Sequence, residues 1–260
     1  EFTISDRGIH LHASWRVTKQ KNLDFEGIDL FHMLGARSLL IACERTTASD
    51  EGQVLKVDPV SKEVLSILTV VLGKRKAARN TTFEGIAVNN RRKQIYLAKE
   101  RHPMALYMLD DKGRLLDRLN QKALLGLFRQ FADRRNLTHR LDGPISASLS
   151  GLDFEEHTGI LAILNRSHRN IVLTVNREKE GLDLEIIDIL QYRIPEDSPY
   201  GNAEGIAVER FDDGGVTLLE RFTWDELDVS EDILPYLRGD TLTMTLWGGP
   251  WGGQPASTPG

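Results

Sequence analysis

The chain has 260 residues, of which 40% are hydrophobic, with a formal charge of −5 and a pI near 5.9. This length suits one large all-β domain or two small domains, and the lack of a basic excess argues against general nucleic-acid binding. The single cysteine, Cys43, excludes an intrachain disulfide framework, and no apolar run is long enough to cross a membrane as a helix.

The first segment, residues 1–17, predicts two strands. Apolar residues alternate from Ile9 to Val17, and Asp6-Arg7-Gly8 supplies turn chemistry before them. No signal peptide opens the sequence. Because the strand pattern begins with the first residues, we expect an anchor or targeting segment upstream.

A tripeptide then recurs along the chain. Glu-Gly-Ile occupies residues 26–28, 84–86 and 204–206, and Ser150-Gly151-Leu152 is a variant of it. Each copy is followed, 15 to 18 residues after its first residue, by a polar pair: Glu44-Arg45, Glu100-Arg101, Asn165-Arg166 or Glu220-Arg221. A β-hairpin with two arms of about seven residues and a short loop returns to its starting level after about this distance. Each tripeptide should therefore lie beside its own polar pair at the open end of a hairpin.

The strands follow the repeats in order. The first repeat predicts strands at 25–31, 38–43, 54–58 and 64–72, and the second predicts strands at 83–88, 94–99, 105–109 and 115–118. The third begins at Ser150 and continues through strands at 160–164, 171–175 and 184–190, and the fourth runs from Ala203 to Arg221. Beyond it we expect an acidic helix at 224–238 and a single strand at 242–247.

An insertion at 120–136 predicts an amphipathic helix. Its apolar stripe contains Leu124, Leu125, Leu127, Phe128 and Phe131. Its basic residues are Lys122, Arg129, Arg134 and Arg135, which we interpret as a solvated face rather than a binding patch.

Four short strands per repeat, with repeats 54 to 66 residues apart, are typical of β-propeller blades with insertions. We predict an all-β propeller of four-stranded blades over residues 1–247 and a flexible Gly/Pro-rich tail at 248–260. The fourth hairpin lacks two outer strands, and residues 1–17 supply two strands without a hairpin. We therefore expect these strands to pair beside the Glu204 hairpin, because an incomplete blade would expose an unpaired edge.

These motifs resemble the SdiA-regulated β-propeller family and, more distantly, the propellers with esterase-like activity of phytase. The similarity rests on the segments 24–28, 83–87, 149–152, 202–207, 99–101 and 163–168, in the family's order. It implies five blades, with four or six as alternatives, on a periplasmic or membrane-anchored bacterial protein with a bound divalent cation, calcium above all. The family opens with a further Ser-Gly-Leu hairpin before the point where this chain begins.

The first strand of each propeller blade lines the central channel, so the tripeptide glutamates should converge near the axis. Converging carboxylates repel one another and require a cation, protonation or interleaved arginines. An oxygen-rich site suits Ca²⁺ or Mg²⁺, and the predicted metal ligands are Glu26, Glu84, Glu204 and Asn165.

The polar pairs offer a second interpretation of the same rim. Arginines accompany the acids, so a ring of alternating charges could neutralise itself without metal. The predicted ligand-binding residues at this rim are Glu44, Glu100, Glu220, Arg45, Arg101, Arg166 and Arg221. The metal site and the salt-bridge lattice both stay open on the sequence.

Motifs for catalysis are absent from the sequence: it has no Gly-x-Ser-x-Gly, His-Glu-x-x-His, P-loop or Cys-x-x-Cys motif. His102 and His168 follow polar pairs and are the candidates for a general base, although such histidines are more often surface residues. Three functions remain: a sensing or binding propeller that holds a cation or small ligand, a metal-dependent hydrolase of phosphate or carboxylic esters, and a scaffold for protein partners.

Overall fold

The computed structural model describes residues 2–5, 8–11, 25–33, 35–43, 51–72, 82–100, 103–135, 148–166, 169–191, 205–211 and 241–247. Within them lie three four-stranded antiparallel sheets and two two-stranded sheets. Each four-stranded sheet is a meander in which consecutive strands are neighbours.

The three meanders are propeller blades, and their strands follow the predicted repeats. The first blade contains β3 (Phe25–Met33), β4 (Ala36–Cys43), β5 (Glu51–Val57) and β6 (Val64–Val71). The second contains β7 (Phe83–Asn89), β8 (Gln94–Lys99), β9 (Ala105–Asp110) and β10 (Leu115–Asn120). The third contains β11 (Leu149–Glu155), β12 (Ile160–Asn165), β13 (Asn170–Asn176) and β14 (Leu184–Gln191). In the second blade Phe83 pairs with Lys99, which puts Glu84 and Glu100 at the same open end of the hairpin, as predicted.

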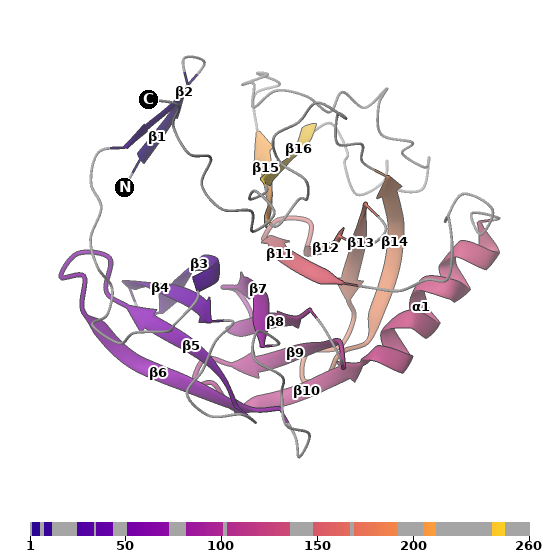
Figure 1. Ribbon diagram of the computed structural model, residues 1–260, viewed down its shortest axis with the longest axis horizontal. Coiled ribbons are helices and arrows are strands. Elements are labelled where there is room, and N and C mark those ends of the chain that lie inside the picture. Colours follow the sequence, from indigo (N-terminus) through magenta and orange to yellow (C-terminus); the bar gives the residue numbers. More distant parts are fainter. Residues whose placement is uncertain are drawn as a thin grey trace, which may run out of the picture.

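The blades radiate around a common centre. Figure 1 shows β3, β7, β11 and β15 (Gly205–Phe211) nearest this centre, with β6, β10 and β14 outside. Neighbouring inner strands contact one another in the order β3, β7, β11, β15. This arrangement is a β-propeller, and the fold class expected from the repeat is confirmed.

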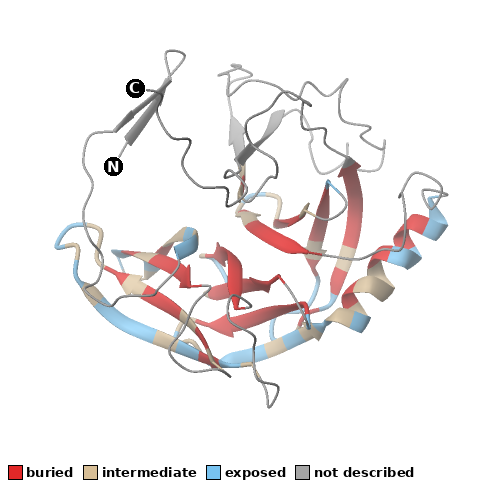
Figure 2. Ribbon diagram, viewed as in Figure 1, coloured by how far each residue is buried: buried red, intermediate tan, exposed pale blue. Residues whose placement is uncertain are grey.

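Burial follows from this layering, because a middle blade has neighbours on both faces. Every residue of β7, β8 and β9 is buried, whereas β6 and β10 at the outer edge are mostly exposed (Figure 2). Strands covered on both faces lose the alternation of polar and apolar residues and become almost continuously apolar. The sequence 94–99 illustrates this, since only its two ends are strongly polar.

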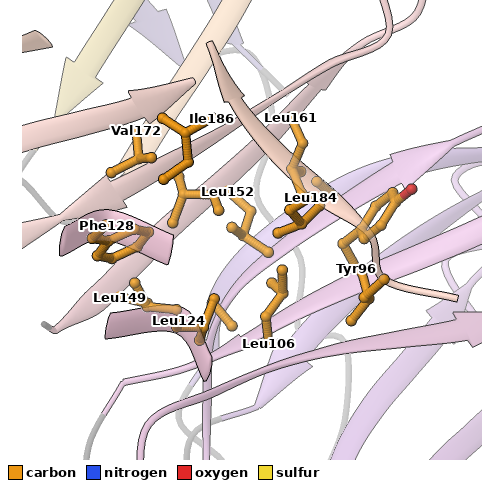
Figure 3. Close-up of a cluster of buried hydrophobic side chains, with 14 of the residues drawn as sticks. Tyr96, Leu106, Leu124, Phe128, Leu149, Leu152, Leu161, Val172, Leu184 and Ile186 are labelled. Carbon is orange, nitrogen blue, oxygen red and sulfur yellow. The ribbon is translucent and has the colours of Figure 1, made fainter. Parts of the chain in front are cut away.

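The largest core fills the space between the second and third blades. Tyr96 and Leu106 reach it from the second blade, and Leu152 and Val172 reach it from the third (Figure 3). A second core joins the first and second blades around Phe31 and Phe83, and a third joins the third blade to β15.

The predicted helical insertion is α1 (Gln121–Arg134), which packs against the outer side of the core between the second and third blades (Figure 1). Asn120 caps it, because its Oδ1 accepts a hydrogen bond from the amide of Ala123 at 3.1 Å. The helix buries Leu124, Phe128, Phe131 and Ala132. Lys122, Arg129, Arg134 and Arg135 are exposed, as the solvated-face interpretation expects.

The fourth repeat differs from the prediction. Its inner strand β15 pairs with β16 (Thr241–Trp247), with Gly205 opposite Trp247, whereas the expected partner ending at Glu220-Arg221 lies outside the described residues. The predicted single strand at 242–247 is therefore the partner of the inner strand. The prediction placed the end of the hairpin at Arg221 because it applied the short hairpin turn of the other repeats to the fourth repeat. The predicted helix at 224–238 and the tail at 248–260 lie outside the described residues.

The N-terminal strands form a hairpin of their own. Residues 1–17 contribute β1 (Phe2–Ser5) and β2 (Gly8–Leu11), which pair with each other. Among the described strands they do not join the sheet of β15, so the expected completion of that blade by strand pairing is not found. The described part of the chain also contains no helix with the length and apolar character needed to span a membrane.

Candidate functional site

The glycine of the tripeptide lies where two inner strands approach closely. A Cβ on Gly27 would lie 2.9 Å from the amide nitrogen of Ile86, and a Cβ on Gly85 would lie 2.8 Å from that of Leu152. Real Cβ atoms do not approach backbone this closely, so these positions require glycine. The recurring glycine therefore has a packing role between successive blades.

The polar pairs meet across the boundary between blades. Arg166, from the pair of the third blade, forms an ion pair through its Nη2 with Oε1 of Glu100, from the pair of the second blade. The same oxygen accepts a hydrogen bond from the Ser148 hydroxyl at 2.5 Å. Glu100 is 2% exposed, and so this carboxylate is neutralised inside the protein by an arginine of the next blade.

Backbone groups complete this rim network. Asn165, a predicted metal ligand, accepts a hydrogen bond from the amide of Ser148 at 3.1 Å through its Oδ1. The amide of Arg166 donates to the carbonyl of Ser148 at 2.9 Å. The Asn165 side chain thus holds the start of the third inner strand, and together with Glu100 and Arg166 it supports the salt-bridge interpretation at this point of the rim.

The tripeptide glutamates are placed unequally. Glu84 is buried whereas Glu26 is exposed, and both interact with other groups. Within the described ranges, no three or more His, Cys, Asp or Glu side chains are grouped so that they could hold a metal ion. Glu204 lies outside those ranges, so convergence of the three glutamates stays a prediction.

Two aspartates that the sequence analysis did not select occupy the channel side of the blades. Asp29 follows the first tripeptide and Asp153 follows the third. The Oδ2 of Asp29 accepts a hydrogen bond from the amide of Val88 at 2.6 Å, and Oδ2 of Asp153 accepts one from the amide of Val208. Inner strands are sheet edges with free N–H groups. Each aspartate therefore joins its own blade to the inner strand of the next blade.

These aspartates lie in an electrostatically unfavourable place. The pKa of Asp29 is raised from 3.8 to about 7, mainly by burial and in smaller part by the negative charges of Asp153 and Glu156, while hydrogen bonds from the Leu30 and Val88 amides lower it. Burial also raises the pKa of Asp153, against hydrogen bonds from the amides of Val208 and Phe154. Carboxylates of the third blade thus lie close enough to Asp29 of the first blade to disfavour its ionised form.

Glu156 extends this acidic region to the turn of the third inner hairpin. Its Oε1 accepts a hydrogen bond from the amide of Asn90, which lies in the corresponding turn of the second blade. Its Oε2 is buried and has no hydrogen-bond partner among the described residues. The Asn90 side chain in turn accepts from the amide of His32 at 2.7 Å and donates to the carbonyl of Leu30 at 3.1 Å. Asn90 and Glu156 therefore link the turns of the second and third inner hairpins to each other and to β3 of the first blade.

The remaining predicted site residues lie outside the described residues. They are Glu44, Glu220, Arg45, Arg101, Arg221 and the two histidines His102 and His168. Their predicted roles, including that of a hydrolytic general base, stay predictions.

One signal in the sequence could have identified the aspartates. The residue after the tripeptide is Asp in the first and third copies and Ala in the second and fourth, as Asp29, Ala87, Asp153 and Ala207 show. A charged residue that alternates with alanine inside an apolar inner strand requires a polar partner on the adjacent strand. The predicted site residues came from the first position of the motif, whereas these aspartates occupy the fourth.

Comparison with known proteins gives one family. The family model described as SdiA-regulated matches residues 15–215. A search of curated proteins gives no match.

Similar solved structures share little sequence identity with this chain. The structure of U3-55K has a TM-score of 0.42 at 10% identity, over 72% of this chain and 43% of that chain. A protein of unknown function from Bacteroides caccae has a TM-score of 0.41 at 8% identity, over 72% of this chain and 50% of that chain. The Dos1 propeller has a TM-score of 0.39 at 9% identity, over 72% and 38%. The chain spans half or less of the length of these structures.

Proposed function

Because the chain belongs to the SdiA-regulated family, we propose that it is a binding propeller of the bacterial cell envelope whose channel takes a divalent cation, calcium in the first place. The observation that carries this proposal is the buried position of Asp29 near the carboxylates of Asp153 and Glu156, whose negative charges add to the effect of burial in raising its pKa. A divalent cation near these groups would relieve their mutual repulsion and favour all of them in the ionised form.

The channel aspartates suit this role better than the Glu100 part of the rim does. Glu100 already has Arg166 as a counter-charge, so a cation there would have to displace an internal ion pair. Calcium takes six to eight oxygen ligands and readily includes water and backbone carbonyls among them. Since no group of three or more His, Cys, Asp or Glu side chains in the described residues could hold a metal ion, a cation beside Asp29 and Asp153 would take most of its ligands from water and backbone carbonyls.

Calcium titration of the purified chain tests the proposal, with melting temperature and heat of binding as the two measurements. Calcium at a hundredfold excess over its dissociation constant should stabilise the fold by about 2.7 kcal/mol, and EDTA should reverse the shift. Asp29→Asn and Asp153→Asn should each abolish the shift. The matched control is Asp133→Asn, since Asp133 is exposed on α1 and should leave the response unchanged.

The same titration distinguishes a cation at the channel aspartates from a cation at the tripeptide glutamates. If Glu84→Gln abolishes the calcium response and the two aspartate variants retain it, the cation binds at the tripeptide glutamates instead. If calcium gives neither heat nor a shift with the unaltered chain, the cation proposal is wrong. The cell-envelope location is tested separately by fractionating cells that express the gene with its native upstream sequence.

A further inference from the structure

Each blade packs one particular face on the blade before it. In the second blade this face carries a row of paired residues, Ile86, Leu97 and Tyr107, and in the third it carries the row Leu152, Ile163, Val172 and Ile189. These side chains belong to the cores shared with the first and second blades respectively. Ile206 of the fourth repeat likewise joins the core of the third blade. The last residue of the tripeptide thus marks the face that turns to the preceding blade.

The first blade has the same row but leaves its ends uncovered. Ile28, Ile41, Leu55 and Ile67 pair across its four strands. Ile28 is 59% exposed, whereas its equivalents Ile86 and Leu152 are 3% and 5% exposed. Ile67, at the other end of the row, is 47% exposed. Most large exposed apolar residues of the described chain lie in this blade: Phe25, Ile28, Val60, Leu65, Ile67 and Val71.

A polar atom on the same face also lacks a partner. Gln53 pairs with Cys43 and Thr69, and Cys43 packs in the same small core as Ile41 and Leu55. The Oε1 of Gln53 is buried and has no hydrogen-bond partner among the described residues. A buried acceptor of this kind normally receives a donor. The face of the first blade that carries Ile28 and Ile67 therefore offers a packing partner both an apolar row and a hydrogen-bond acceptor, the Oε1 of Gln53.

The N-terminal hairpin has the pattern that this face requires. Phe2 pairs with Leu11 and Ile4 pairs with Ile9, so these four apolar positions fall on one face of the two-stranded sheet. Thr3, Ser5, Gly8 and His10 fall on the other. Isolated two-stranded sheets are at best marginally stable in water and need an apolar surface to pack on.

The hairpin also has the necessary reach. Residues 12–24 separate it from β3, and a chain of that length can span about 40 Å when extended. We propose that in solution the apolar face of the β1–β2 hairpin packs on the Ile28–Ile67 face of the first blade, in the place that a preceding blade takes elsewhere in the ring. The hairpin then closes the fold by face-to-face packing.

A pair of charge substitutions on the full chain tests whether the face is covered. Ile67→Asp should lower the melting temperature by about 5 °C or more. Leu115→Asp is the matched control, because Leu115 is 49% exposed on the outer strand of the second blade. It should lower the melting temperature by less than about 2 °C. Equal small losses for both variants would show that nothing packs on the first blade and would overturn the proposal.

A double-mutant cycle identifies the occupant. Ile4→Ser with Ile9→Ser removes the apolar face of the hairpin and should cost about as much as Ile67→Asp. The combined variant should lose no more than the larger single loss, because both changes break the same contact. Additive losses would assign the face to another segment. A melting temperature that rises with protein concentration, together with a dimer that Ile67→Asp dissociates, would assign it to a second copy; both results overturn the proposal.

Discussion

Glu100 of the second blade and Arg166 of the third blade form an ion pair across the boundary between two sheets. Both residues belong to the polar pairs that close the inner hairpins, but the contact joins different pairs. The charge of one repeat is therefore balanced by the next repeat, and the integrity of the rim depends on the packing of neighbouring blades.

Arg166→Leu should leave the buried Glu100 carboxylate without this counter-charge. We expect the free energy of unfolding to fall by on the order of 3 kcal/mol, measured by urea denaturation at pH 7. Arg177→Leu is the control, because Arg177 pairs with Glu185 on the surface with side chains 61% and 39% exposed. Its cost should be below about 1 kcal/mol. Equal costs for the two variants would show that the buried ion pair between Glu100 and Arg166 stabilises the fold no more than a surface pair does.

Gly85→Ala should be strongly destabilising. The added Cβ would lie 2.8 Å from the Leu152 nitrogen and 2.9 Å from the Gly151 carbonyl carbon, and backbone atoms cannot move away cheaply. A loss of about 3 kcal/mol is expected in urea denaturation. Gly126→Ala provides the contrast, because apart from its chain neighbours and the backbone of α1 itself no heavy atom lies within 4 Å of the new Cβ. That change should stabilise the chain by about 0.5–1 kcal/mol, through helix propensity. A tolerated alanine at position 85 would contradict the close strand approach.

Asp29 should make stability fall as the pH rises. Its folded pKa of about 7 lies above the ordinary value of 3.8, so the folded state holds the proton more tightly than the unfolded state. The resulting stabilisation is fully present below about pH 4 and is lost as the pH rises to about 7. Its full size is on the order of 4 kcal/mol.

The measurement is urea denaturation from pH 4 to pH 8, without calcium, for the unaltered chain and for Asp29→Asn. The variant does not titrate at this position, so the difference between the two proteins should shift in favour of Asn as the pH rises. A difference that stays constant with pH would show that burial does not raise the pKa of this carboxyl group. Asp153 titrates in both proteins, and its contribution largely cancels in the comparison.

Cys43 should be almost unreactive in the folded chain. Its thiol is fully buried in the first blade, and burial raises its pKa to about 12. Since the thiolate is the reactive form, labelling with a disulfide reagent at pH 8 should be slow in buffer and fast in urea. Ile41 and Leu55 pack with Cys43 in a buried cluster, so the thiol should stay inaccessible. Rapid labelling of the folded chain would instead show that the first blade opens locally.

The repeat allowed most of the fold to be predicted. Apolar arms of constant length between the tripeptide and the polar pair fix a hairpin, because both of its ends must return to one level. Glu84 and Glu100 illustrate this success. The partner of β15 could not be found in the same way, because 29 residues separate β15 from β16 and local spacing carries no information about such a connection.

The candidate site was harder to predict, for a related reason. The pairing of Glu100 with Arg166, and of Asp29 with the amide of Val88, depends on the angle between blades. A repeat shows which residues are equivalent in successive blades. It does not show which of them meet across the boundary, and for this reason the sequence left open whether arginines or a cation neutralise the acids of the rim.

The glycines between inner strands also limit how blades can be exchanged. The space above Gly85 is filled by Gly151 and Leu152 of the next blade, and the space above Gly27 by Ile86. A blade transplanted from another propeller would fit only if it brought a residue without a side chain to this point and an inner strand of matching path. Recombination within such a ring should therefore succeed when adjacent blades are moved together and fail when one blade is replaced alone.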